Sequence, residues 1–310
     1  MESAIVTGAT SFLGIALINY MKRAGITAYA VVRPNSCRLQ EIPKGENISV
    51  IECELSELDT LPTIPKKADA FFHIGWTSDF SAPRSNEKGQ FLNVKYAEKA
   101  MHLAERCGCH TFLGVGSQAE CGLVNGCITS DTPPSPLTAY AKAKIAAYHS
   151  LAEMSQKSGM KLYWPRLLSA YGPYDRPHTL IMSCIRAALS GQEIALTPAT
   201  QIWDYIYVDD AAEALFRIAE YGKPMRHYPI GSGIGGSLRS YIECIAKITN
   251  NYNLLKGIGA KQYSENQVMN LLADIGDLKK DTGFSCHTDF CEGIKKTINF
   301  VKNQNEILAP

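Results

Sequence analysis

The sequence of 310 residues lacks long apolar runs and lacks a recognisable export signal. No run of consecutive apolar residues is long enough to cross a bilayer, which argues against a transmembrane helix. The first residues, Met1 to Val6, contain no basic segment followed by an apolar stretch and a cleavage site, so they do not resemble a signal peptide. We therefore expect a cytoplasmic protein that has no membrane partner.

The sequence also lacks an excess of positive or negative charge. The chain carries 31 Lys and Arg residues against 30 Asp and Glu residues, a formal net charge of +1. A chain this close to neutrality has no general attraction for nucleic acid or for anionic membranes. Hydrophobic residues make up 45% of the sequence, which is ordinary for a folded globular protein. We expect a sizeable core and no nucleic-acid partner.

Cysteine, in contrast, is plentiful, with ten residues. The cluster Cys107-Gly108-Cys109-His110 is too tightly spaced for a zinc site, and no second pair lies at a matching distance. Buried, reduced thiols are the usual state of cysteine in a cytosolic protein. We therefore predict no metal site and interpret most of the cysteines as buried packing residues, including those of the group Cys286, His287 and Cys291.

The first half of the chain alternates short apolar runs with helical patterns. Strands are predicted at 4–6, 28–32, 48–51, 70–74, 111–115 and 162–167, and helices at 12–24, 90–106 and 139–157. Strands that alternate with helices of this length indicate right-handed crossovers and a parallel sheet that is covered on both faces. The predicted fold class is therefore α/β, with a Rossmann doubly wound parallel sheet.

After about residue 172 the pattern becomes more irregular. Helices are predicted at 180–190 and 210–221, and strands at 202–208 and 227–230. We assign 1–172 to the Rossmann domain, to which 201–231 returns. Segments 173–200 and 232–310 are assigned to a smaller, mostly helical substrate-binding domain.

A glycine-rich segment lies between the first strand and the first helix. A pyrophosphate group needs backbone N–H groups that point toward it and a backbone that it can approach closely. Gly8 permits the tight turn, and Gly14 lets the helix pack against the strand. The alternative is a plain glycine turn without a ligand. The predicted cofactor contacts in this loop are Gly8, Thr10, Ser11, Phe12, Leu13 and Gly14.

The residue that follows the second strand of a Rossmann sheet decides whether NAD or NADP is bound. A carboxylate there bonds the ribose 2′-hydroxyl of NAD, whereas an arginine accepts the 2′-phosphate of NADP. The sequence has Arg33 at this point, which offers a bidentate fork to a phosphate. We predict that NADP(H) is preferred and keep NAD(H), with Arg33 as a solvated surface residue, as the alternative. Further predicted cofactor contacts are Glu54, Leu55, Ile74 and Leu167.

Tyr140 and Lys144 carry the predicted chemistry. They are four residues apart in a helical segment and therefore share one face. A free phenol has a pKa of about 10, which a nearby ammonium lowers toward the range useful for proton transfer. Ser117 ends the fifth strand, at the edge where ligands bind in such sheets. The alternative is an exposed helix face without a catalytic role.

These residues and several further motifs make the chain resemble a known family. The motifs are Thr7-Gly8-x-x-x-x-x-Gly14, His73, Asn93, Ser117 before Gly122, Tyr140 with Lys144, Pro165-Arg166, Tyr171-Gly172-Pro173, and 204–210. The chain resembles the extended short-chain dehydrogenases/reductases of the NAD-dependent epimerase/dehydratase type, over nearly its whole length. Segment 196–249 is most similar to nucleotide-sugar 4-ketoreductases of the abequose synthase kind.

The resemblance implies roles for several residues. Ser117, Tyr140 and Lys144 correspond to the catalytic triad, and Lys144 also binds the nicotinamide ribose. The family's members form homodimers through the helices that here contain Asn93 and Tyr140, so a homodimer is expected. The predicted substrate contacts are Trp76, Gln118, Ser169, Arg176 and Trp203.

The chain also departs from the family pattern. The dehydratases carry Asp-Glu directly after the residue that matches Ser117, and here Gln118 and Ala119 stand there. The family asparagine near the start of the substrate domain is replaced by Ser169. Of the two family arginines that hold the substrate diphosphate, one is replaced by Trp203 and the other is missing near Ser264. Dehydration is therefore not expected, and Arg176 is one substitute for the missing positive charge.

Three functions follow as hypotheses. The first is NADPH-dependent reduction of a 4-keto group on a nucleotide-linked sugar, with Tyr140 as the proton donor. The second is a nucleotide-sugar 4-epimerase that keeps its NAD(P) bound. The third is a non-catalytic cofactor-binding protein, against which the intact Ser117, Tyr140 and Lys144 set argues.

Overall fold

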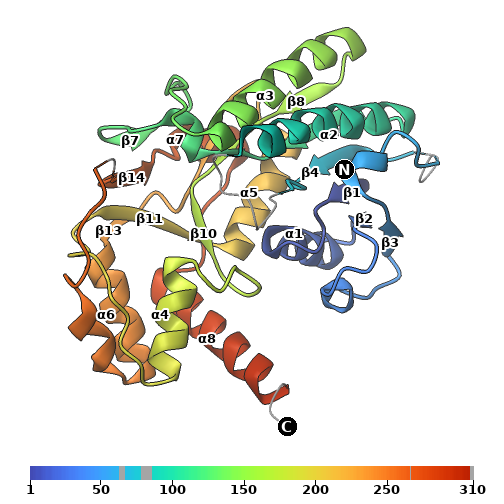
Figure 1. Cartoon of the computed structure of the whole chain (residues 1–310). Coiled ribbons are helices and arrows are strands. Elements are labelled where there is room, and N and C mark those ends of the chain that lie inside the picture. The colour runs from blue at the N-terminus through green and yellow to red at the C-terminus, as the bar shows by residue number, and fades with distance from the viewer. Residues whose placement is uncertain (63–66, 78–85, 266, 308–310) are drawn as a thin grey trace.

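Parallel strands form the main sheet of the chain (Figure 1). The computed structural model describes residues 1–62, 67–77, 86–265 and 267–307. The strands run in the order β3-β2-β1-β4-β5-β8, and every neighbouring pair is parallel. Their bounds are β1 Ser3–Thr7, β2 Thr27–Val32, β3 Ile48–Glu52, β4 Ala70–His73, β5 Thr111–Gly114 and β8 Lys161–Tyr163. The order reverses between β1 and β4, and a crevice at the carboxyl ends of such strands is where ligands bind.

Helices cover both faces of this sheet. The bounds are α1 Phe12–Arg23, α2 Glu87–Arg106, α3 Ala139–Ser158 and α5 Val208–Tyr221. Helices α2 and α3 lie side by side on one face, and α1 packs against α5 on the other (Figure 1). Successive side chains of a strand point to opposite faces, and Val6 accordingly joins one core cluster while Ile5 joins the other. The predicted doubly wound Rossmann sheet is confirmed.

The prediction of a single strand at 162–167 is wrong. Strand β8 ends at Tyr163, and Arg166–Leu167 forms a separate strand, β9, in a small sheet of order β12-β9-β6. Proline has no N–H with which to continue a ladder, and Pro165 lies between the two strands. Strand β6 is Gly116–Ser117 and strand β12 is Pro229–Ile230. This break places Ser117 in register with Leu167.

The rest of the chain forms a second, smaller sheet and its helices. Strand β11 (Ile202–Tyr207) is central, with β10 (Ser169–Tyr171) and β14 (Asn270–Ala273) parallel to it and β13 (Gly235–Ser237) antiparallel. Strand β7 (Cys127–Ile128) pairs with β14. The helices are α4 Leu180–Leu189, α6 Leu238–Thr249, α7 Gly276–Thr282 and α8 Phe290–Ile307. Short 3₁₀ helices are η1 Leu39–Glu41, η2 Leu55–Glu57, η3 Gln118–Cys121 and η4 Tyr252–Gly257. The division of the chain into domains at residues 172, 201 and 231 stays a prediction.

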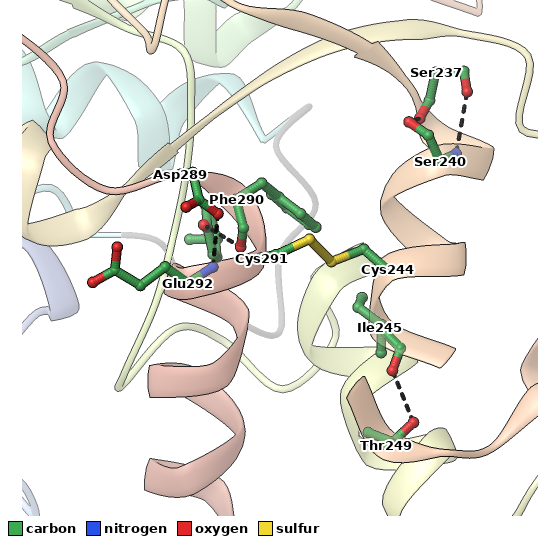
Figure 2. Close-up of a disulfide and its surroundings, with 10 residues drawn as sticks. Ser237, Ser240, Cys244, Ile245, Thr249, Asp289, Phe290, Cys291 and Glu292 are labelled. Atoms are coloured by element: carbon green, nitrogen blue, oxygen red, sulfur yellow. Dashed lines mark hydrogen bonds between the residues drawn. A yellow bond between two sulfur atoms is a disulfide. The ribbon is translucent and has the colours of Figure 1, made fainter. Parts of the chain in front are cut away.

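A disulfide joins two helices of this second part (Figure 2). It links Cys244 on α6 to Cys291 in the first turn of α8, 47 residues later in the sequence. The expectation that the cysteines are reduced packing residues is therefore wrong for this pair, because only the fold brings the two positions together. Five of the eight free cysteines are buried, whereas Cys37 and Cys127 are exposed.

The described residues contain neither a helix suited to cross a membrane nor a cluster suited to hold a metal. No helix in this part of the chain combines the length and the apolar character that a bilayer crossing demands. No group of three or more His, Cys, Asp and Glu side chains in the same residues is arranged to hold a metal ion.

Candidate functional site

The loop between β1 and α1 can be built only with glycine at two positions. Gly8 has a φ of 68°, and a Cβ atom there would lie 2.6 Å from the backbone nitrogen of Gly75. A Cβ atom on Gly14 would lie 2.3 Å from the carbonyl oxygen of Gly8. Since neither contact is sterically allowed, the loop, the end of β4 and the helix start are held in close approach. This close approach of bare backbone is what a dinucleotide pyrophosphate requires.

Ser11 fixes the start of α1 and leaves the helix N-terminus directed at the loop. Its hydroxyl accepts a hydrogen bond from the N–H of Gly14 at 3.0 Å, and its own N–H donates to the carbonyl of Gly8 at 2.9 Å. No acidic residue lies in the first turn of α1 to repel an anion. Thr10 and Phe12 are half-buried, whereas Leu13 is buried in the core. The loop therefore fits the phosphates of a dinucleotide.

The other predicted cofactor contacts lie at the ends of neighbouring strands. The Leu55 side chain lies close to Gly75, because a Cβ atom on Gly75 would be 3.0 Å from it. The N–H of Ile74 donates to the carbonyl of Thr7, and Glu54 is half-buried just before η2. Leu167 is half-buried and lies farther along the same edge, beside Ser117.

Arg33 follows β2 directly and is exposed. No hydrogen bond or ion pair joins its guanidinium to another described residue. Arg38 has a different role, because its Nη1 donates to the carbonyl of Tyr174 at 2.9 Å and its guanidinium lies 6.0 Å over the Tyr174 ring. Arg33 is therefore the better placed of the two to meet a phosphate from outside the protein.

Lys144 is buried at the carboxyl end of the main sheet, with a relative exposure of 5%. Its Nζ donates a hydrogen bond to the carbonyl of Val115 at 2.7 Å, two residues before Ser117. Burial lowers the pKa of Lys144 to about 7, while the negative charge of Glu120 acts in the opposite direction. A lysine with this pKa changes its charge near neutrality, as groups at active sites often do.

Tyr140 lies on the same face of α3 as Lys144, one turn closer to the N-terminus. The hydroxyl of Thr138 accepts from the N–H of Ala141 and so fixes where the helix begins. The ammonium of Lys144 is 5.9 Å from the centre of the Tyr140 ring. The ring of Trp76 meets the Tyr140 ring edge to face, with centroids 6.0 Å apart.

Ser117 occupies the turn from β6 into η3, against which α3 packs. Its hydroxyl oxygen accepts a hydrogen bond from the N–H of Ala119 at 3.2 Å. The hydroxyl proton remains available to donate, because a serine hydroxyl both accepts and donates. The structure thus brings Ser117, Tyr140 and Lys144 to one strand edge, and their catalytic roles stay a prediction.

A buried carboxylate beneath this edge was not predicted. Glu120 accepts from the N–H of Ser117 at 2.8 Å and from the indole N–H of Trp164 at 3.2 Å, and it forms an ion pair with Arg166. Burial raises the pKa of Glu120, although Arg166 and Lys144 oppose that shift. The spacing Ser-x-x-Glu is the signature of a capping box, which the structure contains here. That signal was present in the sequence.

His73 is a second buried polar residue at the edge. Its Nδ1 lies 2.9 Å from the hydroxyl of Thr7, and its Nε2 has no hydrogen-bond partner among the described residues. Burial lowers the pKa of His73 to about 3, and the positive charge of Lys144 adds to this effect. His73 is therefore neutral at physiological pH and places no second cation beside Lys144.

The predicted substrate contacts are only partly brought together. Trp203 donates its indole N–H to the hydroxyl of Ser169 at 2.7 Å. The two residues that stand where the family has an arginine and an asparagine therefore bond to each other. Ser169 lies two residues beyond Leu167, the register partner of Ser117. Gln118 is half-buried at the start of η3, whereas Arg176 is exposed on the loop between β10 and α4. Trp76 lies against Lys144.

Comparison with known proteins identifies the family. The model of the NAD dependent epimerase/dehydratase family matches residues 4–231, which is more than half of the chain. The chain belongs to this family. As a member of the epimerase/dehydratase family it is an enzyme of the NAD-dependent oxidoreductase type, and the resemblance noted in its sequence is confirmed.

Individual relatives within the epimerase/dehydratase family are distant. A dTDP-glucose 4,6-dehydratase of Escherichia coli is 26% identical over 188 residues, which is 57% of this chain and 52% of that relative. The chain therefore spans about half the length of that relative. A CDP-abequose synthase of Salmonella muenchen is 23% identical over 316 residues, covering 96% of this chain and 97% of the relative.

Solved structures of the epimerase/dehydratase type share the fold. A UDP-glucuronic acid 4-epimerase from Bacillus cereus, in complex with UDP-glucuronic acid and NAD, matches with a TM-score of 0.81 and 18% identity. The match covers 97% of this chain and 99% of the epimerase. At this identity the likeness establishes the fold alone, and that neighbour binds NAD.

Proposed function

We propose that this enzyme reduces a 4-keto group on a nucleotide-linked deoxysugar with NADPH. The observation that carries the proposal is the buried ammonium of Lys144, which lies beside Tyr140 and bonds the carbonyl of Val115, two residues before Ser117. A positive charge near the phenol favours the phenolate and lowers the energy needed to release its proton. By resemblance we also propose a cytoplasmic homodimer that pairs through α2 and α3.

Each residue of the site has one step in this reaction. A nicotinamide dinucleotide held by the loop of Gly8 and Gly14 would supply the hydride for the carbonyl carbon. Tyr140 donates the proton from its hydroxyl to the carbonyl oxygen, and the Ser117 hydroxyl donates a hydrogen bond to the same oxygen. Lys144 keeps a positive charge near the phenolate that forms, which stabilises that charge in a site where water is scarce.

Arg33 supports NADPH rather than NADH as the reductant. It is exposed directly after β2, where a 2′-phosphate would meet it, and no carboxylate stands in that place. A reductase exchanges its cofactor at every turnover and commonly uses NADPH, whereas an epimerase keeps its cofactor through both half-reactions. NADPH use therefore favours reduction.

Dehydration is not proposed, because the residues that follow Ser117 cannot supply an acid and a base. Gln118 and Ala119 carry no titratable group. The nearest carboxylate, Glu120, is buried and is already bonded to Ser117, Trp164 and Arg166.

The proposed function is tested by following NADPH consumption with a panel of nucleotide-linked 4-keto sugars. We expect Tyr140→Phe to lower kcat by about 10²- to 10⁴-fold, because it removes the proton donor, while NADPH affinity is retained. Tyr221→Phe is the matched control, since that tyrosine is 59% exposed on α5. An unchanged kcat in Tyr140→Phe would refute the assigned role.

A 4-epimerase is the second candidate, because the chain shares its fold with a solved 4-epimerase. The two reactions differ in their cofactor balance. Isomerisation of a nucleotide sugar without net NADPH consumption would favour the epimerase, and stoichiometric oxidation of NADPH favours the reductase.

A further inference from the structure

Trp76 presents the face of its indole ring to the ammonium of Lys144. The Nζ atom lies 3.6 Å from the ring centre, which is a close cation–π contact. The same ring meets Tyr140 edge to face. Trp76 therefore touches both predicted proton-transfer groups from outside α3.

The position of the Trp76 ring is fixed from α2. Its indole N–H donates to the side-chain oxygen of Gln90 at 3.0 Å, and Gln90 is itself buried. The neighbouring residue, Thr77, is bonded to Asn93 through both its N–H at 2.7 Å and its carbonyl at 3.0 Å. Two side chains one turn apart on α2 thus hold the segment that carries Trp76, and the ring cannot turn away without breaking its bond to Gln90.

We propose that Trp76 is a positioning residue that holds the ammonium of Lys144 in its charged form beside Tyr140. The proposal rests on the proposed function in that Lys144 is the residue that assists proton transfer from Tyr140. It assigns to Trp76 a role that is separate from the predicted contact with the substrate.

The need for such a residue follows from the burial of Lys144. Removing an ammonium from water is costly unless other groups stabilise its charge. Glu120 faces Lys144 from η3 and favours the charge, but its carboxylate is shared with Arg166 of β9. His73 faces Lys144 from β4 and is neutral, and the more distant Trp164 ring of β8–β9 lies 5.7 Å away. Among the aromatic rings around Nζ of Lys144, Trp76 at 3.6 Å is closer than Trp164 at 5.7 Å and Tyr140 at 5.9 Å.

The geometry also leaves Lys144 able to act on a ligand. An ammonium has three N–H donors. One donates to the carbonyl of Val115, and the Trp76 face lies on a second side of Nζ. The third remains for a hydroxyl group of a bound ligand, which is compatible with the predicted contact to the nicotinamide ribose.

The test uses the full chain labelled with ¹³C at lysine Cε and follows the Cε chemical shifts by NMR across neutral pH. Ordinary lysines titrate near a pKa of about 10.4, so Lys144 is the lysine expected to titrate close to 7. We expect Trp76→Leu to lower the midpoint by about one pH unit. Trp76→Phe keeps an aromatic face and should lower it by less than half as much. Trp203→Leu, which removes a different half-buried indole, should leave it unchanged.

The outcomes separate this inference from the proposed function. A Trp76→Leu midpoint equal to that of the wild type, or Phe and Leu variants with equal midpoints, would overturn the role of the aromatic face. If the role is right, the alkaline limb of the kcat/KM profile of Trp76→Leu moves to lower pH by the same amount as the NMR midpoint. If the wild type reduces none of the keto sugars, the proposed function fails, and the NMR titration still decides the role of Trp76.

Discussion

Glu120 is a buried anion beneath the strand edge that carries Ser117. It is ion-paired with Arg166, both side chains are 2% exposed, and its charge also acts on Lys144. Removing one partner of a buried pair leaves an uncompensated charge, which costs about 3–5 kcal/mol. We expect Glu120→Gln to lower the free energy of unfolding by this amount, measured by urea denaturation.

A double variant provides the control for Glu120. Arg166→Met combined with Glu120→Gln removes both charges, and it should be destabilised by less than the sum of the two single variants. Strict additivity of the two losses would show that the ion pair has no energetic coupling.

His73 should make the folded state sensitive to acid. Its pKa is about 3 in the folded protein because it is buried, against about 6.5 when exposed. The depressed pKa gives a contribution to stability that is complete above pH 6.5 and is lost as the pH falls toward 3, because only the unfolded state then binds the proton. By pH 5 the loss is about 2 kcal/mol.

The measurement for His73 compares the free energy of unfolding near neutrality with that at about pH 5. In His73→Asn the side-chain amide can still bond the Thr7 hydroxyl but does not titrate. We therefore expect this variant to lose about 2 kcal/mol less than the wild type over the same interval. Burial also lowers the pKa of His227, but His227 is present in both proteins and affects them equally. Equal losses of unfolding free energy in the wild type and His73→Asn would therefore contradict a buried neutral His73.

At the scale of elements, the turn from β1 into α1 depends on Gly14. A Cβ atom there would lie 2.3 Å from the Gly8 carbonyl oxygen, so the turn must open before any side chain fits. We expect Gly14→Ala to abolish NADPH binding, measured by calorimetry, and to lower the thermal midpoint. Gly25→Ala is the control, because Gly25 also has a positive φ but a Cβ atom there meets nothing within 4 Å. That variant should lose about 1 kcal/mol of stability and bind NADPH normally.

Helices and strands were predicted well where the sequence pattern that marks them lies within the element itself. The main-sheet strands and the helices that cover them follow from apolar runs and helical periodicity, and their observed ends differ by a few residues. The second sheet was not predicted, because β7, β10, β13 and β14 are short and pair with partners far away in the sequence. The split at Pro165 was missed although proline marks such breaks.

The site shows the same division between local and long-range information. Tyr140 and Lys144 could be placed on one helix face from their spacing alone, and the Ser117 and Glu120 pair carries a local capping signature. The bond between Trp203 and Ser169, the approach of Trp76 to Lys144 and the link between Cys244 and Cys291 join segments 34 to 68 residues apart. Spacing contains no information on such contacts, so only the fold reveals them.

At the scale of the whole molecule, the choice of dinucleotide is expected to appear as a difference in ligand-induced stability. A ligand that binds only the folded state stabilises it by an amount that grows with the logarithm of its concentration over its Kd. If Arg33 bonds the 2′-phosphate, equal concentrations of NADPH should raise the thermal midpoint of the wild type more than NADH. Arg33→Ala should remove that difference, with NADPH affinity falling by about 10- to 100-fold because a charged hydrogen bond is lost.

The control for Arg33 must remove the same charge from the same connection between strands. Lys44 is exposed between β2 and β3, and Lys44→Ala should leave the advantage of NADPH over NADH intact. If Lys44→Ala and Arg33→Ala weaken NADPH equally, the effect is long-range attraction, which should also vanish as the salt concentration rises. If only Arg33→Ala weakens NADPH, and NADH affinity stays constant, the phosphate contact is specific. Equal stabilisation of the wild type by the two dinucleotides would instead favour an enzyme that uses NAD, and with it the 4-epimerase over the reductase.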